Sequence, residues 1–200
     1  MSRYDYTQDW FHWAPEVWEK LKPLLPARQR FLEIGSFEGR SAVWTIENMM
    51  DPDAEIICVD TWEGSEEHTN GELLGASVRF DRNTGMAKAT NPVVVTKVRK
   101  TSYAALTSLA GQSNFDFVYI DGSHVAKDVL TDACLAWPLL KDGGVLVFDD
   151  YLWGQPRDAL HRPKLAVDAF VNLFAEELSV IHVGYQLVVR KNGASQEVQL

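Results

Sequence analysis

The sequence contains little cysteine. Only Cys58 and Cys134 occur among its 200 residues, and each stands within an apolar run. A disulfide framework or a cysteine-rich metal site needs more thiols than this. We therefore expect both cysteines to be buried and reduced, as they would be in a reducing cytoplasm.

Long hydrophobic runs and a secretory leader are also missing. No stretch reaches the roughly 18 consecutive apolar residues that a membrane-spanning helix requires. The first residues, MSRYDYTQDWFHWAPEVW, do not combine a basic segment with an apolar core, as a signal peptide would. These absences predict a soluble, cytoplasmic protein with no membrane partner.

Positive charge is scarce as well. The chain carries 19 Lys and Arg against 28 Asp and Glu, which gives a formal net charge of -9 at pH 7. A nucleic-acid-binding surface needs a stripe of basic side chains with aromatics between them, and the sequence has none. Nucleic acid is therefore excluded as the expected substrate or partner.

Repeats and linker-like stretches are absent, so the sequence predicts one domain, residues 31–200, after an N-terminal extension. Apolar, β-branched runs bounded by turn residues recur along it, and the first five alternate with helical patterns. This alternation is typical of a parallel sheet that is covered by helices on both faces. The predicted strands are residues 30–35, 55–60, 93–98, 115–121, 143–150, 178–183 and 185–191.

Helical patterns fill the intervals between most of these runs. The last two strands are separated only by the neighbourhood of Gly184, so they form a hairpin in which one strand runs antiparallel to the rest. We therefore expect a doubly wound α/β fold with a mostly parallel, seven-stranded sheet and an antiparallel C-terminal hairpin. The predicted helices are residues 40–50, 76–87, 103–109, 126–140 and 166–177.

Aromatic side chains are concentrated in residues 1–30, which we predict to be a helical extension. Six of them lie between Tyr4 and Trp18. Two interpretations stay open: a helix that packs its aromatics on the domain, or a lid or homodimer contact over the functional site. Two long connections, residues 62–91 and 151–163, leave the carboxyl ends of strands, where ligands bind in such sheets. They are the predicted substrate walls.

The run FLEIGSFEGRS, residues 31–41, predicts a strand, a glycine loop and the start of a helix. Gly35 can take positive φ and lets the backbone approach a ligand. The spacing is G-x-x-x-G, whereas the pyrophosphate fingerprint is G-x-G-x-x-G. Free N–H groups at the helix start, with the hydroxyls of Ser36 and Ser41, suit a ligand carboxylate. Asp60 ends the second strand, where a carboxylate can accept hydrogen bonds from a ribose diol.

The longer run FLEIGSFEGRSAV resembles the first motif of class I S-adenosylmethionine-dependent methyltransferases, especially LE-[LI]-G-x-x-x-G-x-S-A-V of the catechol-type O-methyltransferases. The resemblance covers residues 31–150 with specific motifs, and more loosely the hairpin to Arg190. It implies a Rossmann-like methyltransferase fold with S-adenosylmethionine as cofactor. The implied cofactor-binding residues are Glu33, Gly35, Ser36, Gly39, Ser41, Asp60, Thr61, Trp62, Ser102 and Asp121.

Two of these positions have alternative roles. The resemblance places Ser102, in the loop after the third strand, against adenine, but Ser102 could equally cap the helix that follows. Trp62, next to Asp60, either stacks on the purine or packs as a core or lid aromatic. Both alternatives stay open from the sequence.

Acidic residues end the fourth and fifth strands. YIDGSH gives Asp121 and His124, and VFDDY gives Asp149 and Asp150. Because the two strands are expected to be neighbours, three carboxylates meet at one rim and repel one another unless a cation lies between them. Mg²⁺ suits such oxygen ligands, so Asp121, Asp149 and Asp150 are the predicted metal ligands. A metal-free acid–base site is the alternative.

The motifs here resemble the metal-ligand arrangement of catechol-type enzymes and, still more, the D-G-D-x and D-D-Y motifs of sugar and macrolide O-methyltransferases. This chain has Ser123 where the latter group carries a second acid. His124 stands where catechol-type enzymes place a lysine that takes the hydroxyl proton, and a histidine titrates near neutral pH. His124 and Asp121 are therefore the predicted catalytic residues. The alternative for His124 is a structural histidine or a hydrogen-bond partner beside the metal.

Taken together, these residues predict methyl transfer from S-adenosylmethionine to a small hydroxylated molecule such as a sugar, a phenol or a polyketide, with divalent metal assistance. A nitrogen acceptor stays open. One competing function is a nicotinamide-dependent oxidoreductase, which the missing third glycine and the hairpin disfavour. The other is a non-catalytic S-adenosylmethionine-binding protein, which leaves the acidic rim unexplained.

Overall fold

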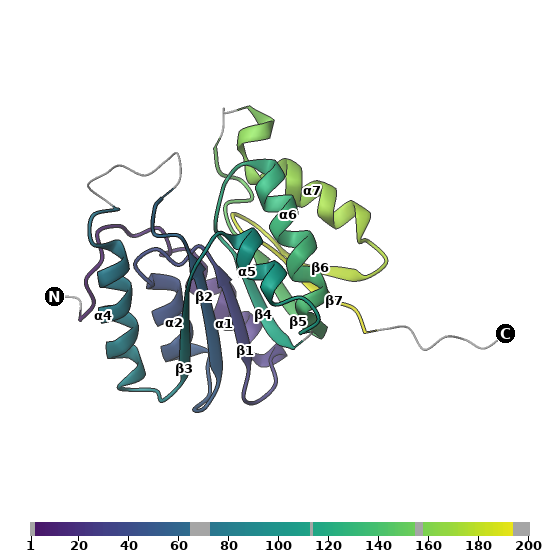
Figure 1. The fold of residues 1–200 in the computed structure, drawn as a ribbon. Coiled ribbons are helices and arrows are strands. Elements are labelled where there is room, and N and C mark those ends of the chain that lie inside the picture. The colour runs from purple at the N-terminus through teal and green to yellow at the C-terminus, as the bar shows by residue number, and fades with distance from the viewer. Residues whose placement is uncertain (1–2, 65–72, 113, 155–157, 194–200) are drawn as a thin grey trace.

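One mixed sheet organises the molecule. The computed structural model describes residues 3–64, 73–112, 114–154 and 158–193. Within them seven strands lie in the order β3-β2-β1-β4-β5-β7-β6 (Figure 1). The strands are β1 (Arg30–Ile34), β2 (Glu55–Asp60), β3 (Val94–Arg99), β4 (Phe115–Ile120), β5 (Leu140–Phe148), β6 (Leu178–Val183) and β7 (Leu187–Lys191).

The strand directions confirm the predicted fold class. β1 to β5 are parallel to one another, whereas β7 runs antiparallel to both of its neighbours, β5 and β6. The C-terminal hairpin therefore exists as expected, and β7 is its reversed strand. β4 is buried along its whole length, but β3 lies at an edge of the sheet and is only partly covered.

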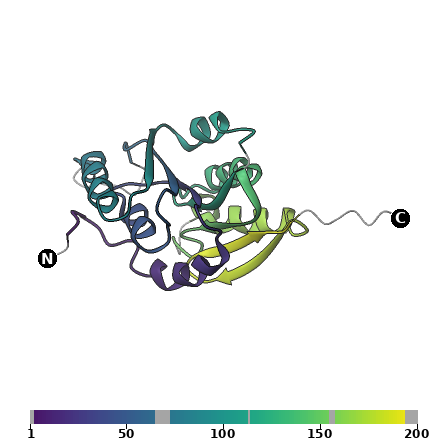
Figure 2. The ribbon, with the colours of Figure 1, turned by 90° about the horizontal axis from the view of Figure 1, so that it is seen from below.

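Helices cover both faces of the sheet (Figure 2). Buried side chains of α1, α2 and α4 belong to one apolar cluster, and those of α5, α6 and α7 belong to a second. None of the helices in the described ranges combines the length and the apolar character needed to cross a bilayer. The helices are α1 (Ala14–Leu21), α2 (Arg40–Asn48), α4 (Ala76–Lys88), α5 (Ser102–Ser108), α6 (Ala126–Ala136) and α7 (Pro163–Leu173), with the short 3-10 helices η1 (Lys22–Leu24), η2 (Trp137–Leu139) and η3 (Ala159–His161).

Prolines explain where the helix boundaries differ from expectation. We expected one helix over 126–140, but α6 ends at Ala136, η2 follows, and β5 already begins at Leu140. Pro138 lacks the N–H that would continue the helix. α7 starts at Pro163, three residues earlier than expected, because a proline is favourable in the first turn.

The two cysteines differ in exposure, which corrects the expectation that both are buried. Cys58 lies in β2 with no exposed surface, whereas Cys134 on α6 is exposed. The buried residues of α6 include Val129, Ala133 and Ala136, which follow helical spacing. Cys134 points away from that face although its neighbours in sequence are apolar. Both thiols are free, as expected.

The N-terminal helix is built into the core. Trp18 of α1 is 1% exposed, and its ring lies edge-on to Phe117 and Tyr119 of β4, with centroids 5.0 and 4.8 Å away. Its indole N–H donates to Gln186 Oε1 at 2.8 Å. The packing interpretation therefore holds for this part of the extension. Two expectations stay predictions: that the extension ends at residue 30, and that its aromatic side chains make a homodimer contact.

Removing the Trp18 side chain should destabilise the protein strongly. We expect Trp18→Ala to lower the free energy of unfolding by about 3–5 kcal/mol, because a large aromatic side chain leaves a cavity. Trp18→Phe should cost about 1–3 kcal/mol, because it leaves the buried Gln186 oxygen without its donor. Urea denaturation measures both. Leu173→Ala, at a 75% exposed position, is the control and should stay within about 0.5 kcal/mol of the wild type. An equally small effect for Trp18→Ala would contradict this account.

Candidate active site

A cavity of about 870 Å³ opens at the carboxyl ends of the central strands. Its volume is in the range of small-molecule sites. The ends of β1, β2, β4 and β5 contribute to its walls, together with the starts of α5 and α6. The predicted wall 62–91 contributes Trp62, Gly64 and Leu73, and the wall 151–163 contributes Trp153. Residues 65–72 and 155–157 of these walls lie outside the described residues.

Gly35 joins the cofactor loop to the loop that follows β4. It has φ +87°, and a Cβ placed on it would lie 1.8 Å from the carbonyl oxygen of Asp121. Only glycine fits this position, because any side chain would collide with backbone. We expected Gly35 to let the backbone approach a ligand. In the structure Gly35 also lets the loop after β1 approach the backbone of the loop after β4.

Glu33 holds the shape of the glycine loop. The Ser36 and Ser41 hydroxyls donate to its carboxylate at 2.6 and 2.5 Å, and Glu33 is 2% exposed. Burial raises the pKa of Glu33 above its ordinary value. We expected these hydroxyls to face a ligand carboxylate; in the structure they face Glu33 instead, because the buried carboxyl needs donors. This corrects their predicted contact.

Asp60 lies at the end of β2 and lines the cavity, as does Thr61. The Asp60 carboxylate accepts hydrogen bonds from the backbone N–H groups of Ser36, Phe37 and Trp62, at 3.0, 2.8 and 2.6 Å. It therefore fixes the loop after β1. Two carboxylate oxygens offer about four acceptor positions, and these N–H groups occupy three of them, so one ribose hydroxyl can still donate to Asp60. That role stays a prediction.

Trp62 packs into the protein. It is 6% exposed, its indole N–H donates to the Phe37 carbonyl at 2.7 Å, and the Lys97 ammonium lies 4.3 Å from its ring centroid. One ring face is thus close to a cation. The geometry favours the core interpretation over stacking on a purine.

Ser102 lines the cavity at the start of α5, where the resemblance places the adenine contact. The cap of this helix is Thr101, whose hydroxyl accepts from the backbone N–H of Ala104 at 3.3 Å. The alternative in which Ser102 is the cap is therefore wrong by one residue. The Ser102 side chain therefore forms part of the cavity wall and does not cap the helix.

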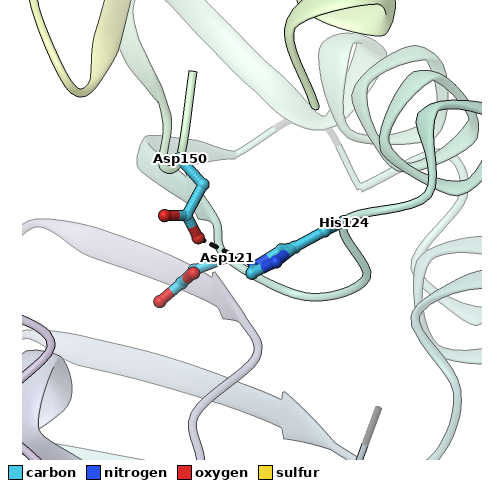
Figure 3. Close-up of side chains that lie close together, drawn as sticks. All are labelled: Asp121, His124 and Asp150. Carbon is cyan, nitrogen blue, oxygen red and sulfur yellow. Dashed lines mark ion pairs between the residues drawn. The ribbon is translucent and has the colours of Figure 1, made fainter. Parts of the chain in front are cut away.

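Three predicted residues converge at the rim of β4 and β5. Asp121, His124 and Asp150 each present one potential ligand atom, and these atoms lie within 4.8 Å of one another (Figure 3). The Nε2 of His124 is 2.8 Å from Oδ2 of Asp150. Asp150 has φ +55°, and the Tyr185 hydroxyl donates to its Oδ1 at 2.7 Å. We refer to these three residues as the acidic cluster.

Asp149 lies behind this cluster. Its Oδ1 accepts from the backbone N–H of Asp150 at 2.7 Å, and its Oδ2 accepts from the Tyr119 hydroxyl and from Nε2 of Gln186 at 3.1 Å. The Tyr119 hydroxyl is also 3.0 Å from Oδ2 of Asp121. The geometry thus differs from the expected ligand set, because His124 stands where we expected Asp149. Tyr119 could have been found from its spacing, since residues i and i+2 of a strand share a face.

The carboxylates of Asp121, Asp149 and Asp150 lie close together, and their mutual repulsion costs electrostatic free energy. Burial raises the pKa of Asp121 well above its usual range, and the nearby Asp149 and Asp150 raise it further. Burial and the neighbouring Asp150 also raise the pKa of Asp149. A cation or a proton in the acidic cluster would relieve this repulsion.

Aromatic side chains surround the acidic cluster, from the N-terminal extension and from the predicted wall 151–163. Trp153 lies edge-on to His124 with centroids 4.3 Å apart, and Trp13 lies edge-on to Tyr185 at 4.8 Å. Trp10 stacks on Phe37 at 5.4 Å. Trp10, Trp13, Trp153 and Tyr185 all line the cavity. The lid interpretation therefore applies to the first part of the extension, while Trp18 packs in the core.

Several solved structures are similar to this chain. One is the O-methyltransferase TomG from Streptomyces achromogenes, involved in tomaymycin synthesis, in complex with S-adenosylmethionine: 22% identity over 89% of this chain and 79% of TomG, TM-score 0.65. Another is an O-methyltransferase from Bacillus cereus in complex with S-adenosylhomocysteine. It is 18% identical, the match covers 88% of this chain and 81% of the Bacillus chain, and the TM-score is 0.60. A third is the MycE methyltransferase of mycinamycin biosynthesis, in complex with Mg and S-adenosylhomocysteine. It is 17% identical, the match covers 95% of this chain and 52% of the MycE chain, and the TM-score is 0.62.

Sequence comparison identifies the family. A search of curated proteins found no match. A family model described as a methyltransferase domain matches residues 32–151, which run from β1 to the residue after Asp150. Because this segment is more than half of the chain, the protein belongs to the methyltransferase domain family, and its fold is that of the class I S-adenosylmethionine-dependent enzymes.

Proposed function

We propose that the protein transfers a methyl group from S-adenosylmethionine to a hydroxyl of a small molecule bound in the 870 Å³ cavity. One observation carries this proposal: the glycine loop, Asp60 and the acidic cluster all line that same cavity. A methyl donor and a group that activates an acceptor can therefore be held side by side. TomG and the Bacillus protein, both O-methyltransferases, have the same fold.

The chemistry needs a base and a positioned acceptor. Bound S-adenosylmethionine would supply a methyl group on a sulfonium. The acceptor oxygen attacks the methyl carbon in one displacement, in which the carbon–sulfur bond breaks and S-adenosylhomocysteine leaves. The hydroxyl proton passes to the His124–Asp150 pair, whose Nε2 and Oδ2 are 2.8 Å apart. Asp150 stabilises the imidazolium, and the Tyr185 hydroxyl holds Asp150 in place.

The acidic cluster also fits a divalent cation, and we propose Mg²⁺. Asp121 and Asp150 provide the carboxylate oxygens that this ion prefers, and its remaining positions suit water and acceptor oxygens. When bound, the ion lowers the pKa of a coordinated hydroxyl. Asp149 adds negative charge from behind, while its own oxygens stay hydrogen-bonded to Tyr119 and Gln186. The structure of MycE contains Mg, which supports the proposal.

The acceptor is proposed to be a ring-bearing alcohol such as a sugar, a phenol or a polyketide. Trp10, Trp13 and Trp153 present aromatic surface to the cavity beside carboxylates that can accept hydrogen bonds from hydroxyls. A structure of MycE holds mycinamycin VI together with Mg and S-adenosylhomocysteine, which supports a small-molecule acceptor here. A cytoplasmic location and a homodimer remain part of the proposal.

Methyl transfer should depend on His124. With methyl-labelled S-adenosylmethionine and a panel of sugar, phenol and polyketide alcohols, we expect wild-type turnover of at least one class. His124→Ala should lower kcat about 10²- to 10⁴-fold, because the proton loses its acceptor. His182→Ala, in β6 away from the cavity, is the matched control and should keep the wild-type rate. An unchanged rate and pH profile in His124→Ala would remove this residue from the mechanism.

Metal dependence should follow Asp121 and Asp150. We expect EDTA to abolish turnover and Mg²⁺ to restore it, and we expect Mn²⁺ binding, followed by electron paramagnetic resonance, to weaken at least tenfold in Asp121→Asn and Asp150→Asn. Asp128→Asn removes a carboxylate from the cavity wall outside the acidic cluster, so it should keep the wild-type Mn²⁺ affinity. Full activity in EDTA, together with no Mn²⁺ binding, would leave the metal-free acid–base site as the mechanism.

A further inference from the structure

The chain before α1 lies against the glycine loop as a strap, which we define as residues 3–10. None of its eight residues is buried. Phe11, which follows the strap, is 6% exposed and lies edge-on to Trp18 with ring centroids 5.0 Å apart. Trp10 of the strap stacks on Phe37 of the glycine loop and lines the cavity. The strap is therefore part of the cavity wall without being part of the apolar core.

Glu38 of the glycine loop anchors the strap. Its carboxylate is 2% exposed and accepts hydrogen bonds from the backbone N–H and the hydroxyl of Thr7, both at 2.7 Å. It also accepts from Nε of Arg79, on α4, at 2.6 Å. A buried carboxylate is costly without such donors. The two contacts with Thr7 therefore favour a strap that lies closed on the loop.

The other anchors of the strap are polar as well. The backbone N–H of Asp5 donates to Oδ1 of Asn83 at 3.0 Å, and Nδ2 of Asn83 donates to the Asp5 carbonyl at 2.9 Å, so the strap runs beside α4 (Figure 1). Asp9 forms an ion pair with Arg40 at 3.1 Å. Water can replace contacts of this kind at little net cost. A segment with few buried apolar contacts opens well before the whole protein unfolds, so the strap can open as a unit before Phe11.

The strap covers the side of the cavity on which the glycine loop lies. Gln8 and Trp10 close a recess of about 60 Å³ against Gly35 and Ser36. Asn83, which holds the strap, also donates to the backbone carbonyl of Glu38 at 3.0 Å. The same side chains therefore hold the strap and the loop together. A methyl donor that binds at this loop would lie beneath the strap.

We propose that the strap is a lid that opens to admit the methyl donor and to release its product, and that Glu38 is the latch of this lid. Opening separates Thr7 from Glu38 and Trp10 from Phe37, while Phe11 stays in the core. Glu38 is a positioning residue, because it acts through Thr7. The inference rests on S-adenosylmethionine as the methyl donor.

The test measures how fast S-adenosylhomocysteine enters and leaves, by stopped-flow tryptophan fluorescence. In Glu38→Gln one carboxylate oxygen is replaced by an N–H₂ group that faces a donor, which weakens the latch. The open state then becomes more populated in the free and in the bound protein alike. We therefore expect the association and dissociation rate constants both to rise about tenfold, while Kd stays within about threefold. A side chain that only contacts the ligand would change the dissociation rate constant.

Two further variants separate the latch from general packing. Thr7→Val removes the hydroxyl donor at an exposed position of the strap and should raise both rate constants about threefold to tenfold. Glu16→Gln breaks an exposed ion pair with Lys20 on α1, outside the strap, and should keep the wild-type rate constants. Thermal melting shows whether each variant is folded; if Glu38→Gln is not, Thr7→Val decides the matter.

The lid is overturned if both strap variants keep the wild-type rate constants, or if only the dissociation rate constant rises. A wild type that does not bind S-adenosylhomocysteine would overturn the cofactor assignment together with this inference. The expected change in both rate constants without methyl transfer to any tested alcohol would support the lid and would reject only the proposed acceptor chemistry.

Discussion

The contact between Gly35 and the backbone of Asp121 is the constraint on which the site depends. β1 and β4 are neighbours in the sheet, and their loops meet where a Cβ on Gly35 would lie 1.8 Å from the Asp121 carbonyl oxygen. The backbone N–H of Asp121 donates to the Ile34 carbonyl at 2.8 Å, and that of Gly35 donates to the Val59 carbonyl at the same distance. The glycine loop and the loop that carries Asp121 and His124 are therefore fixed relative to each other by main chain, and a substitution at Gly35 would displace both.

A buried chain of hydrogen bonds extends this arrangement to the N-terminal helix. The Trp18 indole donates to Gln186, Gln186 donates to Asp149, and the Tyr119 hydroxyl bridges Asp149 and Asp121. Trp18, Tyr119, Gln186 and Asp149 are all buried, so the loss of one would leave its neighbour unpaired. The aromatic extension is thus joined to the cavity in two ways: the Trp18 side chain is linked through Gln186 to Asp149, and Trp10 and Trp13 form part of the cavity wall.

The sequence predicted which residues lie at the strand ends, but it did not predict the direction in which each side chain points there. Alternating apolar runs predicted the sheet, the reversed hairpin and the rim where Asp121 and Asp150 meet, because parallel strands bring their carboxyl ends to one edge. Which of two adjacent aspartates faces the cavity depends on the backbone: Asp150 takes φ +55°, and Asp149 turns inward to Tyr119. The sequence likewise predicted that Ser36 and Ser41 belong to the glycine loop. That their hydroxyls donate to Glu33 becomes evident only when the burial of Glu33 is known.

The charge of the cavity limits what the acceptor can be. Lys100 and Lys127 line it near α5 and α6, whereas the end at β4 and β5 holds Asp121 and Asp150 among aromatic side chains. A phosphorylated or carboxylated acceptor would meet like charge at that end, which costs free energy at short range. A bound Mg²⁺ would offset part of this repulsion, but it would be used in holding the reacting oxygen. For the proposed acceptor, this charge distribution favours an uncharged or positively charged ring that offers hydroxyls to the carboxylates and an apolar face to the tryptophans.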